Sequence, residues 1–156
     1  MIIALGCDHA GFAMKQIVIN HLESMGCRVI DHGCHSPDPV DFPDIARLVC
    51  DSVRKGEADR GLMVCGTGVG ASIAANKIPG IRAAVCHDVH SAHQSVEHDD
   101  VNVMCIGAQI VGPWLARDLI TAYLNARFST EEHFRRRVAK LADLEREAAA
   151  MLREQQ

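Results

Sequence analysis

Five short apolar segments alternate with longer amphipathic segments along the whole chain. The apolar segments have the length of buried strands and lie at residues 2–5, 28–30, 62–65, 82–86 and 102–106. The amphipathic segments have the length of helices and lie at residues 11–25, 43–54, 71–77, 89–97, 113–127 and from residue 130 onward. Strands that alternate with helices in this way predict a parallel sheet with helices on both faces. We therefore expect an α/β fold built on a parallel five-stranded sheet.

The composition is typical of one globular domain, which we expect to span residues 1–156. The net charge is −4 and no basic cluster stands out, which argues against nucleic acid as a partner. The N-terminus has no signal-peptide pattern, and no apolar run approaches the roughly 18 residues of a membrane span. The seven cysteines are an odd number without the spacing of a disulfide framework. We therefore expect reduced thiols, no membrane partner and a cytoplasmic location.

The strongest local signal is a glycine-rich loop that follows the third predicted strand. A thiol, Cys65, ends that strand, and glycines follow at positions 66, 68 and 70 before a helix begins. Such a turn directs successive backbone N–H groups into one concavity, and the helix N-terminus adds partial positive charge. Both effects lower the pKa of a thiol, so we expect Cys65 to be partly thiolate near neutral pH. The spacing does not decide between a base, a nucleophile and an inert buried cysteine.

A second loop, Gly6 to Gly11, also follows a strand and opens a helix. Its Asp8 suits either an acceptor for sugar hydroxyls or a helix cap, and its His9 can donate a hydrogen bond to phosphate. Ligands of parallel sheets bind at the carboxyl ends of the strands, where this loop, the Cys65 loop and residues 86–90 are expected to meet.

A histidine-rich segment contains His87, His90, His93 and His98. Spacings of three residues place several of them on one helical face, so a metal site has to be considered. Neither an H-E-x-x-H arrangement nor a cysteine pair accompanies them, and we therefore expect no metal. Several of these histidines are expected to be exposed helix residues, whereas His98 precedes a polar turn near a sheet edge.

The last predicted helix, residues 130–156, carries an apolar stripe on a charged background. The stripe comprises Val138, Leu141, Leu144, Ala148 and Met151 or Leu152. Such a helix packs either on its own domain or on a second subunit, and the pattern leaves both possibilities open.

Taken together, these motifs resemble the B-type ribose-5-phosphate isomerases, a family that also includes galactose-6-phosphate isomerase subunits. The similarity runs in the same order through roughly residues 1–140. It comprises Gly6–Gly11, Asp41–Pro43, Cys65–Gly70, Ala74–Lys77, Gly80–Ala83, His98–Asn102, Gly107 and Val111–Gly112.

The resemblance implies a Rossmann-like three-layer α/β/α sandwich and an aldose–ketose isomerase that acts on a sugar phosphate. It implies a homodimer or homotetramer with active sites at the dimer interface. We accordingly expect residues 130–156 to be a dimerisation helix that packs on the partner subunit. It implies no metal and no organic cofactor. The expected reaction interconverts ribose 5-phosphate and ribulose 5-phosphate through an enediolate.

The resemblance also implies a role for individual residues. Cys65 is the base that moves the proton between C1 and C2, and His98 helps to open the sugar ring. Asp8 holds sugar hydroxyls, while His9 and an arginine of the last helix bind phosphate. The N–H groups of Gly66, Thr67, Gly68, Val69 and Gly70 bind the enediolate oxygen, and Thr67 assists proton movement at the oxygens.

The sequence departs from the family pattern at positions that bear on the substrate. Asp99 replaces the usual Asn after His98, and Gln109 replaces an arginine that helps to bind phosphate. The first phosphate arginine of the last helix falls on His133, or on Glu132 in another alignment. The second falls on Arg137 or Arg136, and Phe42 replaces a frequent Tyr.

Other activities stay open at this point. Because loss of a bidentate arginine is not a conservative change, the substrate could instead be a tetrose, a hexose or an unphosphorylated sugar. A non-catalytic sugar-phosphate-binding subunit and a cysteine hydrolase that uses Cys65 as nucleophile are further alternatives. A dinucleotide site is disfavoured, because the glycines at 66, 68 and 70 do not follow the G-x-G-x-x-G spacing.

Overall fold

A computed structural model of the chain describes residues 1–154 and contains all the predicted strands and helices. The strands are β1 (Ile2–Cys7), β2 (Arg28–Asp31), β3 (Arg60–Cys65), β4 (Ala83–Val85) and β5 (Val103–Gly107). The helices are α1 (Phe12–Ser24), α2 (Phe42–Arg54), α3 (Val69–Ala75), α4 (Val89–Asp99), α5 (Pro113–Asn125) and α6 (Glu132–Glu154). The last two residues of the predicted dimerisation helix lie outside the described residues.

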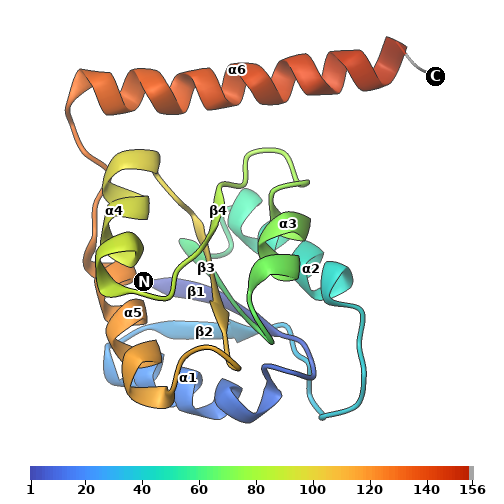
Figure 1. Cartoon of the computed structure of the whole chain (residues 1–156), viewed down its shortest axis with the longest axis vertical. Helices are drawn as coiled ribbons and strands as arrows, with labels where there is room; N and C mark the ends of the chain where they lie inside the picture. Colours follow the sequence, from blue (N-terminus) through green and yellow to red (C-terminus); the bar gives the residue numbers. More distant parts are fainter. Residues whose placement is uncertain (155–156) are drawn as a thin grey trace.

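The five strands form one parallel sheet in the order β2-β1-β3-β5-β4, between two layers of helices (Figure 1). Successive side chains of a strand point to opposite faces, so each central strand contributes to two cores. In β3, for example, Val64 packs in the core under α1, α4 and α5, whereas Met63 and Cys65 pack in the core under α2 and α3. The expected Rossmann-like three-layer α/β/α sandwich is confirmed.

The strand order creates a crevice between β1 and β3. The chain leaves β1 through α1, which covers one face of the sheet, and leaves β3 through α3, which covers the other. The two loops therefore diverge at the carboxyl ends of these neighbouring strands, which is where open α/β sheets bind ligands. The Gly6–Gly11 loop and the Cys65 loop both lie at this position.

Helix α6 lies apart from the α/β body, across one end of it (Figure 1). No residue of α6 between Glu132 and Glu154 is buried. The carboxylate of Glu145 ties the helix to the body by accepting hydrogen bonds of 2.9 and 3.0 Å from the N–H of Gly80. Within residues 1–154, none of the helices has both the length and the apolar character to cross a membrane.

Candidate active site

Cys65 and Asp8 lie side by side at the carboxyl ends of β3 and β1. The N–H of Asp8 donates to the carbonyl of Val64 at 3.2 Å, which fixes the two loops against each other. Both residues are buried, with 7% of Cys65 and 5% of Asp8 exposed. The Asp8 carboxylate accepts a hydrogen bond of 2.9 Å from the N–H of Gly11, and Gly11 itself is the capping residue of α1. The sequence-based alternative of Asp8 as the cap residue is therefore wrong.

The thiol of Cys65 is subject to opposing electrostatic influences. Burial and a hydrogen bond to the Asp8 carboxylate raise the pKa of Cys65, whereas the backbone N–H groups of Gly68 and Thr67 lower it. The net effect is a pKa above the ordinary value for cysteine. The expectation of a lowered pKa is thus wrong in direction, because burial and the neighbouring carboxylate outweigh the loop donors.

The glycine-rich loop is closely packed on both sides. Gly68 has φ = +80°, a left-handed conformation that glycine adopts without strain, and this turn starts α3 at Val69 rather than at residue 71. A Cβ atom on Gly66 would lie 3.2 Å from Oε1 of Gln109, and one on Gly70 would lie 3.0 Å from the ring of Phe42. Two of the positions that depart from the family pattern therefore line the Cys65 loop.

His9 and Thr67 present polar atoms at the same edge of the sheet, and both residues are exposed. The Nδ1 atom of His9 accepts a hydrogen bond of 3.3 Å from the N–H of Val40. The hydroxyl of Thr67 accepts one of 3.4 Å from the N–H of Val69. Cys65, Asp8, His9, Thr67 and Gln109 therefore form one group.

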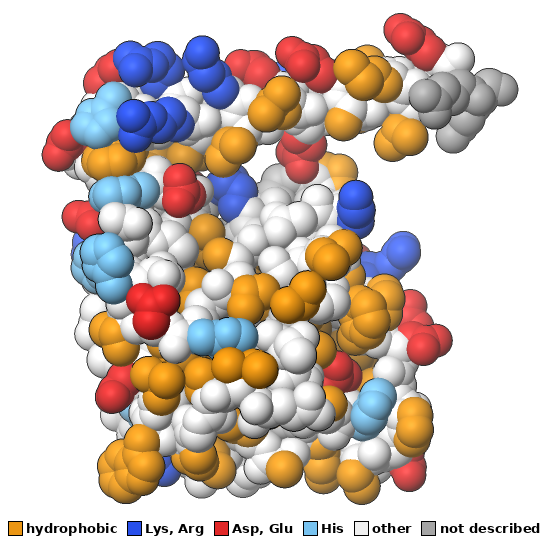
Figure 2. Space-filling model, in the orientation of Figure 1, with side chains coloured by type: hydrophobic (Ala, Val, Ile, Leu, Met, Phe, Trp, Pro, Cys, Tyr) orange, Lys and Arg blue, Asp and Glu red, His pale blue; other side chains and the backbone are white. Residues whose placement is uncertain are grey.

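The other predicted residues form a second group, where the end of α4 meets the start of α6. The ring of His98 stacks on that of Phe134 with 4.0 Å between the ring centres, and the His133 ring lies 4.0 Å from Phe134 on the same measure. The guanidinium of Arg137 lies 5.7 Å from the centre of the Phe134 ring. Figure 2 shows histidine, Lys and Arg side chains gathered at this junction. Asp99, the last residue of α4, is exposed beside them.

Two acidic side chains lie against basic residues of this second group. Arg136 pairs with Glu132 at 3.0 Å, and Nδ1 of His133 lies 3.4 Å from the carboxylate of Glu131. Arg137 forms no ion pair with the residues that the structure describes. Its guanidinium is therefore not neutralised by a neighbouring carboxylate, unlike that of Arg136.

One chain does not bring the two groups together. Helix α4 begins beyond the carboxyl end of β4 and runs back across the sheet. His98, near the end of α4, therefore lies at the side of the sheet where the strands begin. Register pairs Cys65 with Gly107 at one end of β5 and Gly61 with Val103 at the other. Cys65 and His98 therefore lie at opposite edges of the sheet.

Comparison with known proteins identifies the family to which the chain belongs. The family profile described as Ribose/Galactose Isomerase matches residues 3–141. The chain belongs to the ribose/galactose isomerase family.

Named relatives agree with this assignment. The chain is 46% identical to ribose-5-phosphate isomerase B of Escherichia coli, over 86% of this chain and 90% of the relative. It is 38% identical to D-erythrulose-4-phosphate isomerase of Pectobacterium atrosepticum, over 81% of this chain and 84% of the relative. A solved structure of Clostridium thermocellum ribose-5-phosphate isomerase B has a TM-score of 0.92 and 42% identity, covering 95% of this chain and 99% of that one. The chain is thus an aldose–ketose isomerase.

The site of this ribose/galactose isomerase has the parts that proton transfer next to a carbonyl requires. A thiol lies beside a carboxylate, and the backbone N–H groups of Thr67 and Gly68 are close enough to the sulfur to influence its pKa. Within residues 1–154, no cluster of three or more His, Cys, Asp or Glu side chains is arranged to hold a metal ion.

Proposed function

We propose that this isomerase interconverts ribose 5-phosphate and ribulose 5-phosphate through an enediolate, with Cys65 as the base. The observation that carries the proposal is the position of the Cys65 thiol in the β1–β3 crevice, between the Asp8 carboxylate and the N–H groups of Thr67 and Gly68. The names of the relatives from Escherichia coli and Clostridium thermocellum support this substrate.

The chemistry follows from the charges that develop in the reaction. Sugar hydroxyls bind Asp8 and take the place of its hydrogen bond to Cys65, and the thiol then loses its proton to solvent water. The thiolate removes the proton from C2 of the aldose, and the electron pair of that C–H bond forms the C1–C2 double bond of the enediolate. The N–H groups of residues 66–70 stabilise the oxygen anion, with one such donor worth about 3 kcal/mol. Cys65 returns the proton to C1, while Thr67 moves the hydroxyl proton between the two oxygens.

A second copy of the chain completes the active site. His98, Asp99, His133 and Arg137 of one copy reach the Cys65 loop of the other, where they open the sugar ring and bind its phosphate. The separation of the two groups within one chain supports this arrangement, as does the apolar surface that one chain leaves exposed.

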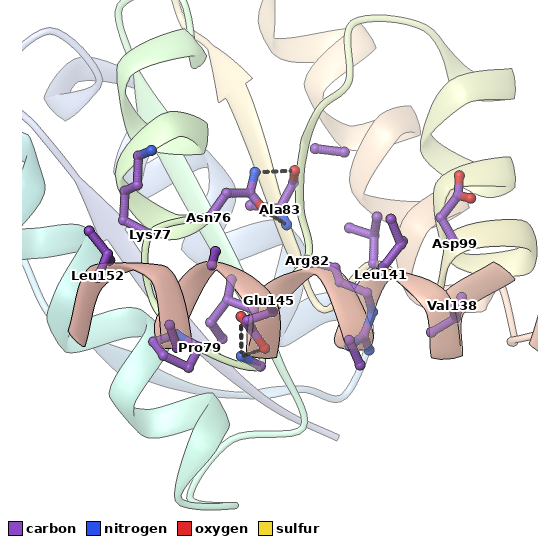
Figure 3. Close-up of a pocket in the computed structure, with 17 residues that line it drawn as sticks. Asn76, Lys77, Pro79, Arg82, Ala83, Asp99, Val138, Leu141, Glu145 and Leu152 are labelled. Atoms are coloured by element: carbon purple, nitrogen blue, oxygen red, sulfur yellow. Dashed lines mark hydrogen bonds between the residues drawn. The ribbon is translucent and has the colours of Figure 1, made fainter. Parts of the chain in front are cut away.

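That apolar surface occurs in two places. Around the Cys65 loop, Val69, Ile73 and Ile110 each expose more than half of their area, at 51%, 58% and 56%. Beneath α6, a groove of about 660 Å³ separates the helix from the body (Figures 2 and 3). Its α6 side carries Leu141 and Leu152 and its other side Pro79 and Ile81. Exposed apolar patches of this kind mark protein interfaces, so a dimer that covers both is favoured.

Another sugar phosphate is the second candidate substrate. Gln109 is neutral and lies against Gly66, and Nδ1 of His133 lies 3.4 Å from the carboxylate of Glu131. These groups suit a substrate whose phosphate lies elsewhere, and the relative from Pectobacterium atrosepticum is named for a four-carbon sugar phosphate.

In either case the enzyme works in the cytoplasm, where its seven cysteines, all free thiols, stay reduced.

Steady-state assays of the purified protein test the reaction and its substrate. The panel is ribose 5-phosphate, allose 6-phosphate, galactose 6-phosphate, tetrose 4-phosphates and the matching free sugars. Cys65→Ala should lower kcat on the best substrate by roughly a thousandfold, because it removes the base. Cys27→Ala is the control, since Cys27 is a partly exposed thiol before β2, far from the loop.

Each result has a distinct meaning. Turnover of ribose 5-phosphate ahead of the other sugars supports the first substrate, and preference for a tetrose phosphate supports the second. Equal rates for wild type and Cys65→Ala would refute the role of Cys65. Tight sugar-phosphate binding without any turnover would indicate a non-catalytic subunit.

A further inference from the structure

His87 belongs to the histidine-rich segment but differs from its neighbours in the structure. It lies between β4 and α4 and is partly buried, whereas His90 and His93 are exposed on α4. Its Nε2 atom accepts a hydrogen bond of 2.9 Å from the backbone N–H of Gly107, the last residue of β5. The expectation that several of these histidines are exposed helix residues holds for His90 and His93.

The short length of β4 explains why Gly107 needs a side-chain partner. β4 ends at Val85, and the last backbone bond between the two strands runs from the N–H of Cys86 to the carbonyl of Cys105 at 3.1 Å. Gly107 continues beyond this point and is buried, so its N–H requires an acceptor. The Nε2 atom of His87 takes the place of the backbone carbonyl that would accept this hydrogen bond if the pairing of β4 with β5 continued.

The Cys65 loop rests on Gly107. Gly107 pairs with Cys65 in the register of β3 and β5. A Cβ atom on Gly107 would lie 2.8 Å from the Cα, C and O atoms of Thr67, and one on Gly68 would lie 3.4 Å from the N atom of Gly107. The backbone of Thr67 and Gly68 is therefore in direct contact with the residue that His87 holds.

We propose that His87 is a positioning residue of the isomerase, which holds the end of β5 so that the N–H groups of Thr67 and Gly68 stay directed at Cys65 and the enediolate. The inference rests on the proposed function of the Cys65 loop. Because Gly107 donates to Nε2, that nitrogen carries no hydrogen, and the ring is neutral with its hydrogen on Nδ1. His87 does not touch the sugar and acts through Gly107.

Two substitutions of similar polarity separate this role from simple packing. In His87→Gln the side-chain carbonyl reaches the position of Nε2 and can accept from Gly107, whereas in His87→Asn it reaches only the position of Nδ1. His90→Asn is the matched control on an exposed histidine of the same segment. Circular dichroism and thermal melting establish that each variant is folded.

Iodoacetamide alkylation of Cys65, followed by peptide mass spectrometry as a function of pH, reports the donors on the sulfur. In His87→Asn the alkylation midpoint should move to higher pH, because misplaced N–H groups no longer favour the thiolate. The same variant should lose about tenfold in kcat with KM changed less than twofold, since the lost donors act on the developing oxygen anion. His87→Gln and His90→Asn should match wild type in both measurements.

The inference is overturned if His87→Asn has the wild-type alkylation profile and kcat, or if folded His87→Gln is as impaired as His87→Asn. Nitrogen NMR of the wild-type protein at neutral pH gives a test that needs no variant. It should show His87 with its hydrogen on Nδ1, and a hydrogen on Nε2 would contradict the inference. Because alkylation and NMR use no substrate, they remain decisive for His87 even if Cys65→Ala retains full isomerase activity.

Discussion

At the scale of single residues, burial and the neighbouring carboxylate of Asp8 both favour the neutral form of the Cys65 thiol. Burial and Asp8 together keep the pKa of Cys65 above its usual value in the free protein. In the proposed mechanism, the base is stored as a thiol and becomes a thiolate once sugar hydroxyls occupy Asp8. A thiol that stays protonated until substrate arrives is also less prone to oxidation and alkylation.

Asp8→Asn tests this influence of Asp8 on the thiol. The substitution removes the negative charge beside the sulfur but keeps an oxygen that can accept from Gly11. The pKa of Cys65 should fall, so its alkylation by iodoacetamide at pH 7 should become faster by several-fold. Asp38→Asn, on the exposed loop before α2, serves as control and should leave the rate unchanged. A slower or equal rate in Asp8→Asn would contradict the proposed influence of Asp8.

Sequence reasoning located features that depend on local geometry and missed features that depend on contacts between distant segments. The Cys65 loop was found because glycine spacing and strand position are both visible in the sequence. The direction of the Cys65 pKa shift was not predicted, because the distance between Asp8 and Cys65 depends on the register of β1 and β3. His87 was missed because the sequence does not show that β4 stops before it can satisfy Gly107.

At the scale of elements, one buried lysine ties α1 to the end of β2. Lys15 of α1 is 8% exposed, and its ammonium donates to the Asp31 carboxylate at 2.8 Å and to the Cys34 carbonyl at 2.6 Å. Burial raises the pKa of Asp31, but the hydrogen bonds from Lys15 and from the N–H of Gly33 outweigh it and lower that pKa overall. An amphipathic pattern places Lys15 on a helix without showing this internal partner.

Lys15→Met should therefore destabilise the protein in a pH-dependent way. Its free energy of unfolding at pH 7 should be lower than that of wild type by about 2 kcal/mol, the cost of losing hydrogen bonds to a charged group. Because the pKa of Asp31 is lowered by folding, its contribution is present above its unfolded value of about 3.9 and is lost as pH falls below that value.

Urea unfolding at fixed protein concentration, at pH 7 and pH 3, measures this difference. The deficit of Lys15→Met should be smaller at pH 3 than at pH 7. Lys55→Met, at an exposed position that ends α2, should have wild-type stability at both values. An unchanged deficit at pH 3 would show that lost packing, and not the ion pair, accounts for the effect.

At the scale of the whole molecule, the two groups of predicted site residues lie apart within a single chain. Cys65 and His98 lie at opposite edges of the sheet, and α6 buries none of its residues between Glu132 and Glu154. A two-fold symmetric dimer would place the second group of each copy at the Cys65 loop of the other. Each dimer would then hold two active sites, with both chains contributing to each site.

Mixing of inactive variants tests this shared site. Cys65→Ala and His98→Asn should each lose activity alone, but in a mixed dimer one site combines Cys65 from the second variant with His98 from the first. Co-expression at equal levels gives half mixed dimers, so the preparation should regain about a quarter of wild-type activity. A site contained in one chain would leave the mixture no more active than the average of the two variants.

The double variant, Cys65→Ala with His98→Asn, provides the converse measurement. Mixed with wild type in equal amounts, it forms dimers in which neither site has both residues, because each site draws one residue from each chain. Activity should then fall to about a quarter of that of an equal total amount of wild-type chain, since only the wild-type dimers remain active. If each chain carried its own complete site, half would remain. The difference between a quarter and a half distinguishes a shared active site from an independent one without any assumption about which sugar is the substrate.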